Sequence, residues 1–215
     1  MVAVRRQVEL LEKNRPRQER AKRTYKAILT AAAELLIEVG VERISTNLVA
    51  ERAGITVPAL YRYFPNKYAV LNALGAALMD RQNRVFREWF EKYRDANDPL
   101  VLLGNIFEVL KQTYDVTREQ SGGLEVVQAL RAVGPLQEVR LASHRLLAEQ
   151  FAEMASEILG RPVDDDLMNQ ARVTIDMGYA IVEMALEDET LKPQNILREG
   201  ANLIQAYWQS IVAGA

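Results

Sequence analysis

The sequence contains no cysteine and a single histidine, His144, among its 215 residues. Without cysteine the chain has no disulfide framework, no thiolate metal site and no cysteine nucleophile. One histidine rules out metal sites that need two and weakens any acid–base mechanism, so we expect a structural or solvent-facing role for it. No glycine-rich phosphate loop is present. We therefore expect a protein that is not an enzyme, with no catalytic residue, no metal site and no cofactor.

Long apolar runs are also missing. No segment approaches the ~18 residues that a membrane span needs, and no signal-peptide core is visible. Hydrophobic residues nevertheless make up 49% of the chain, enough for a sizeable core. No strand-like alternation, heptad array or internal repeat stands out, whereas apolar residues recur at helical spacing. The sequence therefore predicts an all-α protein, in the cytoplasm and without a membrane partner.

Positive charge is unevenly distributed. Residues 1–68 carry 13 Lys and Arg against 7 Glu and no Asp, whereas residues 69–215 carry 14 against 22 acidic residues. A basic module on an acidic body suits a polyanionic partner for one end only. Chance clustering of solvated charges is the alternative that composition alone leaves open.

The stretch from Ser45 to Leu71, STNLVAERAGITVPALYRYFPNKYAVL, predicts two short helices joined by a glycine turn. Thr46 is the expected N-cap of the first helix, which would place Leu48, Val49 and Ala53 on its apolar side. Gly54 stands where a helix ends in a residue with positive φ. Thr56 then caps the second helix, with Pro58 in its first turn. Two such helices form a helix-turn-helix, whose second helix enters the major groove of DNA.

A longer helix precedes this motif. Apolar residues recur at three- and four-residue spacing from Arg17 to Val39, and Gly40 is the expected C′ residue with positive φ. The three helices together would make one DNA-binding module. The preceding residues, 1–16, are basic and include a proline at their end, and we expect them to form a mobile arm or one that touches DNA.

The motif closely resembles the DNA-binding domain of the TetR family of bacterial transcriptional repressors. The resemblance covers roughly Arg17 to Gly75, and Pro58 replaces the commoner glycine of the family pattern. The matching residues are Thr46, Val49-Ala50, Ala53-Gly54-Ile55-Thr56, Leu60-Tyr61, Tyr63-Phe64, Lys67 and Leu71. It implies a mobile basic arm (1–16), a helix-turn-helix domain (17–66) and a ligand-binding and dimerisation domain (67–215).

The DNA contacts are expected around the second helix of the motif. Only Thr56 and Arg62 there can hydrogen-bond a base edge, and only Arg62 can do so in bidentate fashion to guanine. A phosphate contact for Arg62 is an equally good alternative. Tyr63 and Lys67 are expected to hold phosphates. The full set of expected DNA-binding residues is Thr46, Thr56, Val57, Pro58, Ala59, Tyr61, Arg62, Tyr63 and Lys67.

The remainder of the chain predicts further helices. One begins at Lys67 and runs to about Arg94, another begins at Asp98-Pro99 and continues through Tyr114, and a short one spans Leu124 to Val133. Three more follow, at Leu136–Leu159, Leu167–Leu186 and Ile196–Val212. Three aspartates, 164–166, precede the second of these, where acidic residues favour a helix N-terminus.

The last two predicted helices are apolar on several faces, which requires cover from several sides. The TetR resemblance favours a homodimer formed through these helices over a monomeric core. It also implies a small-molecule effector, of unknown identity, held in the C-terminal domain. Polar residues within apolar helices are the candidate ligand contacts: Gln112, Tyr114, Gln128, Arg131, Arg172, Asp176 and Glu183.

The resemblance thus implies a ligand-responsive repressor that binds a palindromic DNA operator as a homodimer. In such a protein, ligand binding would move the helix that begins at Lys67 and change the spacing of the two recognition helices. Two alternatives remain at this point. The first is a constitutive DNA-binding protein whose C-terminal domain only dimerises. The second is an all-α interaction module in which the helix-turn-helix is merely structural.

Overall fold

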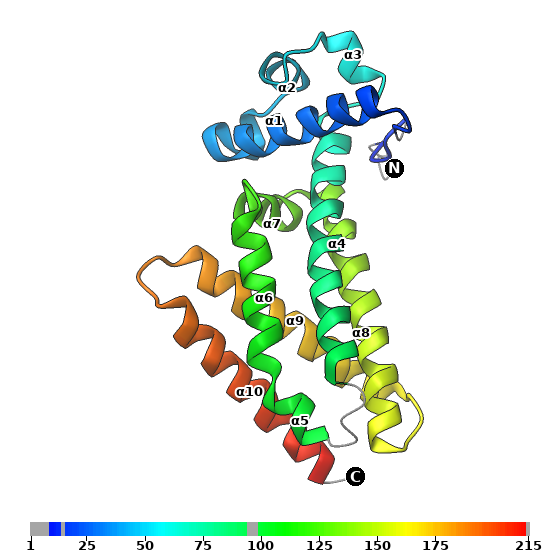
Figure 1. Ribbon diagram of the computed structural model, residues 1–215, viewed down its shortest axis with the longest axis vertical. Coiled ribbons are helices and arrows are strands. Elements are labelled where there is room, and N and C mark those ends of the chain that lie inside the picture. Colours follow the sequence, from blue (N-terminus) through cyan, green and yellow to red (C-terminus); the bar gives the residue numbers. More distant parts are fainter. Residues whose placement is uncertain (1–8, 14–15, 94–98, 214–215) are drawn as a thin grey trace, which may run out of the picture. The chain divides into compact units, whose positions relative to one another are not determined.

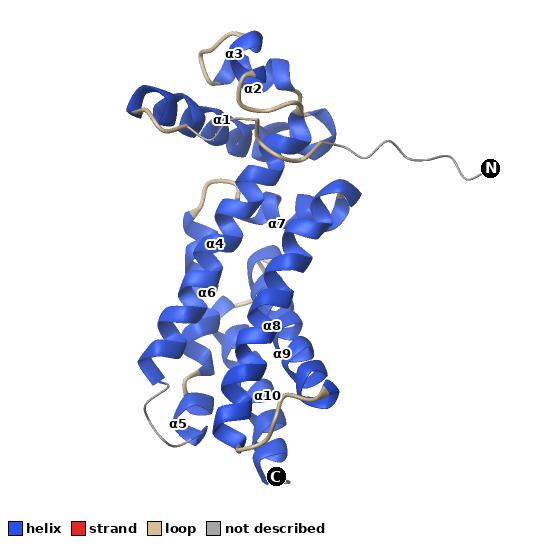
Figure 2. Ribbon diagram, turned by 90° about the vertical axis from the view of Figure 1, so that its right-hand side faces the viewer, coloured by secondary structure: helices blue, strands red, loops and turns tan. Residues whose placement is uncertain are grey.

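The computed structural model describes residues 9–13, 16–93 and 99–213, and every regular element in these ranges is helical (Figures 1 and 2). The expected all-α class is therefore confirmed. Within the same ranges, no helix combines the length and apolarity that crossing a membrane requires. In chain order the elements are α1 (Glu19–Arg43), α2 (Thr46–Arg52), α3 (Val57–Tyr61), α4 (Lys67–Tyr93), α5 (Pro99–Gly104), α6 (Ile106–Glu119), α7 (Gly123–Ala132), the 3-10 turn η2 (Gly134–Leu136), α8 (Gln137–Leu159), α9 (Asp165–Glu187) and α10 (Pro193–Ala213).

The chain divides into two compact units. Unit 1 comprises the described parts of residues 1–79 and 120–140, and unit 2 those of residues 80–119 and 141–215. Helices α4 and α8 each contribute residues to both. This division differs from the expected domains because the first turns of α4, and all of α7, pack into unit 1. The domain boundary expected at residues 66 and 67 remains a prediction.

Unit 1 is built on α1, which buries one face of small and aliphatic side chains. Gly40 interrupts it with φ 72° and ψ 172°, a conformation that only glycine adopts without strain. The positive φ is as expected, but one more turn follows, to Arg43. Buried residues of this helix are Ile28, Ala31, Ala32, Ala33, Leu35 and Leu36.

The core of unit 1 gathers side chains from helices far apart in the chain. Phe64, just after α3, is fully buried, and its ring centre lies 5.2 Å from that of Tyr25. Leu74 of α4 and Leu130 of α7 belong to the same buried cluster. At Gly75, between these helices, an added Cβ would lie 2.7 Å from a methyl group of Leu130. The close fit explains why α7 belongs with the helix-turn-helix.

Unit 2 contains α5, α6, α9 and α10, with most of α4 and α8. Helices α9 and α10 lie side by side (Figure 1). The single helix expected from Asp98-Pro99 through Tyr114 is instead two, because Asn105 forms a turn. The carbonyl oxygen of Asn105 accepts the indole N–H of Trp89 at 3.0 Å.

Helix α9 begins as expected from its acidic start. Asp164 is the N-cap, and its Oδ1 accepts from the main-chain N–H of Leu167 at 2.8 Å. Asp165 and Asp166 occupy the first turn, where negative charge meets the positive end of the helix dipole. The aspartates therefore have a structural explanation.

Candidate nucleic-acid interface and ligand cavity

The first helix of the predicted motif begins one residue earlier than expected. The N-cap is Ser45, whose Oγ accepts from the main-chain N–H of Leu48 at 3.3 Å. The cap assigned to Thr46 is therefore wrong, because Thr46 is already the first helical residue. Its hydroxyl lies 3.2 Å from the hydroxyl of Tyr61 instead, a hydrogen bond that joins α2 to α3.

The turn and the start of α3 are as predicted. Gly54 has φ 65°. A Cβ at this position would have no atom within 4 Å, so the backbone conformation, and not a lack of space, requires glycine there. Thr56 is the N-cap of α3, with its Oγ1 accepting from the N–H of Ala59 at 3.3 Å. Pro58 sits in the first turn, where no intrahelical N–H is needed. Arg62 is the C-cap.

The exposed side of α3 carries most of the residues expected to meet DNA. Thr56, Pro58, Tyr61 and Arg62 are exposed, while Val57, Ala59 and Tyr63 are half-buried. Leu48 of α2 was expected on the apolar side, but 36% of its surface is exposed, like the 41% of Tyr61. Helices α2 and α3 thus expose both apolar and polar side chains, as a surface that contacts base edges requires.

Lys67 is held at the start of α4 by main-chain oxygens. Its Nζ donates to the carbonyl oxygens of Val41 and Glu42, both at 3.2 Å. These two bonds engage two of its three ammonium hydrogens and tie α4 to the end of α1. The expected contact of Lys67 with a phosphate remains a prediction, now for an ammonium whose position is fixed.

Arg52 has a role that the sequence did not indicate. Its two terminal nitrogens contact Glu38 at 2.6 and 2.7 Å, and one of them contacts Glu34 at 3.3 Å. This fork of hydrogen bonds joins α2 to α1. The Arg52 guanidinium holds the pKa of the Glu38 carboxyl below its ordinary value. Because the spacing between these residues is long, no local motif could have revealed the pair.

Part of the expected N-terminal arm is attached to the end of α3. The N–H of Lys13 donates to the carbonyl oxygen of Tyr63 at 2.8 Å, and Asn66 Nδ2 donates to the carbonyl oxygen of Glu9 at 2.9 Å. Leu10 packs against the unit 1 core. Residues 1–8 and 14–15 of the arm lie outside the described residues.

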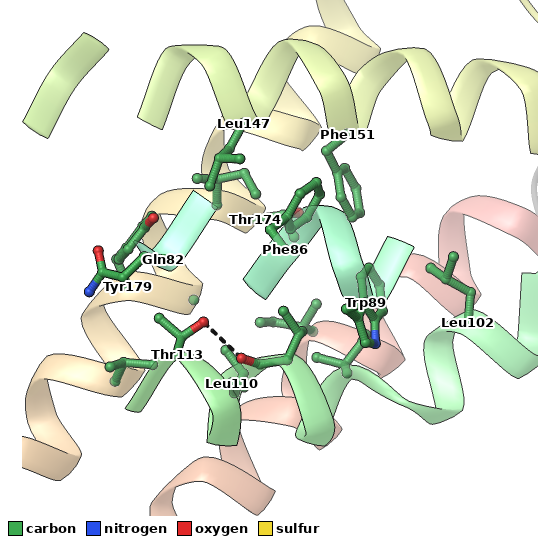
Figure 3. Close-up of a pocket in the computed structure, with 16 residues that line it drawn as sticks. Gln82, Phe86, Trp89, Leu102, Leu110, Thr113, Leu147, Phe151, Thr174 and Tyr179 are labelled. Atoms are coloured by element: carbon green, nitrogen blue, oxygen red, sulfur yellow. Dashed lines mark hydrogen bonds between the residues drawn. The ribbon is translucent and has the colours of Figure 1, made fainter. Parts of the chain in front are cut away.

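Unit 2 contains an apolar cavity of ≈ 70 Å³ between its helices (Figure 3). No lining side chain carries a charge, and aromatic rings from α4, α8 and α9 form much of the wall. The lining residues are Gln82, Phe86, Trp89, Leu102, Ile106, Val109, Leu110, Thr113, Leu147, Phe151, Thr174, Ile175, Gly178, Tyr179, Val182 and Ile204.

None of the seven candidate ligand contacts lines this cavity. Gln128 and Arg131 are exposed residues of α7 in unit 1, and Tyr114 is buried elsewhere in the unit 2 core. Gln112 donates to Glu108 at 3.1 Å. On α9, the cavity-facing positions are 174, 175, 178, 179 and 182, so Arg172, Asp176 and Glu183 lie on other sides of the helix.

The sequence did contain a signal for the cavity, in α4. Gln82, Phe86 and Trp89 stand four and three residues apart, so they share one helix face, and all three line the cavity. This stripe is the local pattern from which the cavity wall on α4 could have been predicted.

His144 is buried, with 1% of its surface exposed. Its ring stacks on Tyr179 with centres 4.1 Å apart, and its Nδ1 lies 2.5 Å from Asp176 Oδ1. Arg172 Nε forms an ion pair with Asp176 Oδ2 at 2.8 Å. These contacts join α8 to α9 and give the histidine and both charged residues structural partners.

Comparison with known proteins gives the helix-turn-helix a context. Residues 28–74 match the model of the "Bacterial regulatory proteins, tetR family". The chain is 47% identical to the class C tetracycline repressor of Escherichia coli over 53 residues, which are 25% of this chain and 24% of that protein. The matched segment thus spans about a quarter of the length of such curated relatives.

Solved structures match over most of the chain. A TetR-family regulator from Streptomyces coelicolor is 28% identical, with a TM-score of 0.55 over 87% of this chain and 98% of that one. A complex of SmeT with triclosan, 19% identical, matches the fold with a TM-score of 0.61 over 86% and 90% of the two chains. SmeT is the repressor of a Stenotrophomonas maltophilia efflux pump. In its helix-turn-helix segment this chain thus matches the TetR family of bacterial regulatory proteins, and its all-helical fold is that of solved TetR-family regulators.

Proposed function

We propose that the protein is a ligand-responsive transcriptional repressor that binds a palindromic DNA operator as a homodimer. The observation that carries the proposal is the surface of α3. A side-chain cap and a glycine turn fix its N-terminus, and its exposed residues include a threonine, a tyrosine and an arginine. This is the arrangement by which a recognition helix presents its first turn to the major groove.

Recognition of the DNA base sequence would depend on a few side chains of α3 and its ends. Thr56 and Arg62 can hydrogen-bond base edges, while Val57, Pro58 and Ala59 offer apolar contacts to thymine methyl groups. Tyr63 and Lys67 would hold phosphates on either side of the groove. We therefore expect half-sites with thymines near the start of α3, and a guanine opposite Arg62 if that residue reads a base.

The dimer would form through α9 and α10. Large apolar side chains on these two helices remain exposed, Val173 by 53%, Met184 by 52% and Leu203 by 57%. The two helices are closely packed, since a Cβ on Gly200 would lie 2.5 Å from Ile181. A pair of helices with exposed apolar faces is suited to form a four-helix bundle with a second copy.

The oligomeric state tests this part of the proposal. Leu203→Glu places a charge at the centre of the proposed interface and should convert the dimer into a monomer in analytical ultracentrifugation. Leu146→Glu, on α8 and 43% exposed, is the matched control and should leave the dimer intact. An unchanged dimer in the Leu203 variant would place the interface elsewhere.

The unit 2 cavity is the proposed effector site, and α4 is the proposed connection to the DNA-binding surface. Three residues of α4 line the cavity, and its first turns belong to unit 1. A coupling free energy of about 1–3 kcal/mol would weaken operator affinity by roughly 5- to 150-fold, enough to release a promoter.

Selection of bound fragments from the DNA of the encoding organism tests the proposal as a whole. We expect an inverted repeat whose half-site centres are separated by about one helical turn, or a simple multiple. Fragments without twofold symmetry would contradict the homodimeric repressor. A subsequent ligand screen by thermal shift separates it from a constitutive DNA-binding protein, which would respond to no compound.

A further inference from the structure

Gln82 is a cavity residue whose hydrogen bonding is incomplete. It is 2% exposed, and its Nε2 donates to Thr117 Oγ1 at 2.7 Å. Its Oε1 is equally buried but has no hydrogen-bond partner. A buried carbonyl oxygen is unfavourable until it accepts a hydrogen bond, so this atom marks a position where a donor is missing.

The orientation of the Gln82 amide follows from its neighbours. The Thr117 hydroxyl donates its single hydrogen to the carbonyl oxygen of Thr113 at 2.7 Å, so toward Gln82 it can only accept. Turning the amide over would require the Thr117 hydroxyl to withdraw its hydrogen from the Thr113 carbonyl oxygen and donate it to Gln82 instead. The arrangement that keeps both hydrogen bonds has the nitrogen toward Thr117, and the oxygen is then the end that remains for another molecule.

The other polar side chains of the wall already donate their hydrogens. The hydroxyls of Thr113 and Thr174 each donate to the carbonyl oxygen four residues earlier, both at 2.8 Å (Figure 3 shows the first of these bonds). The indole N–H of Trp89 is used by a main-chain oxygen, and the Tyr179 hydroxyl is hydrogen-bonded to Ser143. These hydroxyls and the indole cannot donate to a bound molecule without giving up a partner.

The charges around this end of the cavity disfavour an anion. Burial, together with the nearby carboxylates of Asp176 and Glu183, raises the pKa of the Tyr179 hydroxyl well above its ordinary value. Asp176 is itself paired with Arg172, but no cationic side chain is among the described residues that line the cavity, so a buried anion there would have no partner charge. In Figure 3 the side chains of Gln82 and Tyr179 lie at one end of the cavity, and Trp89 and Leu102 at the other.

We propose that this cavity selects an uncharged, largely apolar molecule that donates one hydrogen bond to Gln82 Oε1, with a phenol-type hydroxyl as the simplest example. Its ring would lie among Phe86, Trp89 and Phe151. The seven residue steps from Gln82 to Trp89 span about 10 Å of helix, which a substituted ring fills. This inference rests on the proposed function, of which it specifies the effector class.

The size of the cavity adds a condition. At ≈ 70 Å³ it is smaller than the roughly 150 Å³ of an apolar cavity that holds benzene. The walls must therefore move apart as the molecule enters, and α4 is one of those walls. A single water molecule is the rival occupant, because it too could donate to Gln82.

Three probes of similar shape test the donor rule: 4-methylphenol, 1,4-dimethylbenzene and 4-methylbenzoate. Their binding to the full chain can be followed by tryptophan fluorescence, since Trp89 lines the cavity. We expect 4-methylphenol to bind about tenfold more tightly than 1,4-dimethylbenzene, the effect of one net hydrogen bond, and 4-methylbenzoate to bind most weakly. Equal binding of the first two, as expected if water alone occupies the site, or tighter binding of the benzoate, would overturn the rule and leave the cavity as an effector site.

Two variants locate the effect at Gln82. Gln82→Met removes the acceptor at similar volume and should weaken 4-methylphenol about tenfold while leaving 1,4-dimethylbenzene unchanged. Thr117→Val is the second variant, for the case that the first does not fold. Thr117→Val removes the acceptor of the Gln82 amide N–H, so the amide is no longer oriented. The ratio of 4-methylphenol to 1,4-dimethylbenzene affinity should therefore become smaller. A preference that survives in both variants would overturn the assignment, and no binding of any probe to the wild type would overturn the effector site itself as well.

Discussion

The two units differ in how far apart along the chain the residues of their candidate sites lie. The proposed DNA-binding surface of unit 1 lies between Ser45 and Lys67 and is shaped by caps and a turn that are local in sequence. The cavity of unit 2 draws side chains from Gln82 to Ile204, on six helices. A local site depends on backbone conformations that single residues enforce, whereas a dispersed one depends on the packing of a whole core.

The two candidate sites also differ in how particular polar side chains are engaged. In unit 1, Lys67 and Arg52 are engaged by groups of the same unit, which fixes the helices before any partner arrives. In unit 2, Gln82 keeps an acceptor open. The first arrangement presents a preformed surface, whereas the second, in our proposal, is completed by the molecule that it binds.

The largest effect is expected at the turn of unit 1. Gly54→Val places a β-branched residue at φ 65° and should lower the free energy of unfolding by about 1–3 kcal/mol and abolish DNA binding. Chemical denaturation and a duplex-binding assay measure the two effects. The control is Gly104→Val in unit 2, an exposed glycine without positive φ, for which a change within about 0.5 kcal/mol is expected. A folded Gly54→Val protein with full DNA binding would show that the turn does not depend on glycine.

Arg62→Ala tests whether α3 reads a base with its last turn. If Arg62 contacts guanine, the change should cost about 1–3 kcal/mol at one base pair of each half-site and relax the preference there. Binding to a randomised operator library measures this position by position. Equal weakening of every sequence would instead assign Arg62 to a phosphate.

Lys67→Ala should reduce the slope of log affinity against log salt by about one unit, because one phosphate contact and its released counterion are lost. The slope matters more than the affinity, since Lys67 also holds two carbonyl oxygens within unit 1. Lys92→Ala, which removes the same charge from unit 2, is the control and should leave the slope unchanged. An unaltered slope for the Lys67 variant would make this lysine purely structural.

The smallest effects are expected from acid. Lys92 first, and Tyr93 next, lower the pKa of Glu108 in unit 2, as Arg52 lowers that of Glu38 in unit 1. A carboxyl whose pKa is lowered by folding stabilises the protein above its unfolded-state pKa, and this stability is lost as the pH falls through the folded-state pKa. Thermal unfolding between pH 7 and pH 3 should therefore show a smaller loss for Glu108→Gln or Glu38→Gln than for the wild type. Losses equal to that of the wild type would mean that these pairs do not contribute.

Sequence reasoning succeeded where the physics is local. The glycine turn, the cap at Thr56 and the acidic start of α9 were predicted because each depends on residues a few positions apart. The same reasoning placed a cap at Thr46 when Ser45, its neighbour, was equally suited. A single helix was predicted in place of α5 and α6, because no residue near Asn105 indicates that its carbonyl oxygen will accept the Trp89 indole N–H.

The cavity could not be predicted in the same way. Which face of α6 or α9 turns inward depends on helices distant in the chain, so polar residues such as Arg172 and Gln112 looked like ligand contacts but lie elsewhere. The Arg52–Glu38 pair was missed for the same reason. Only the shared helix face of Gln82, Phe86 and Trp89 could have been predicted from the sequence.

One titration tests whether this chain recognises a specific DNA sequence. The wild-type protein is titrated against a selected operator and against a duplex of the same composition in scrambled order, at physiological salt. We expect the operator to be bound at least about 10³-fold more tightly, the lower limit for specific recognition. Equal affinities for the two duplexes, with the same dependence on salt, would contradict it.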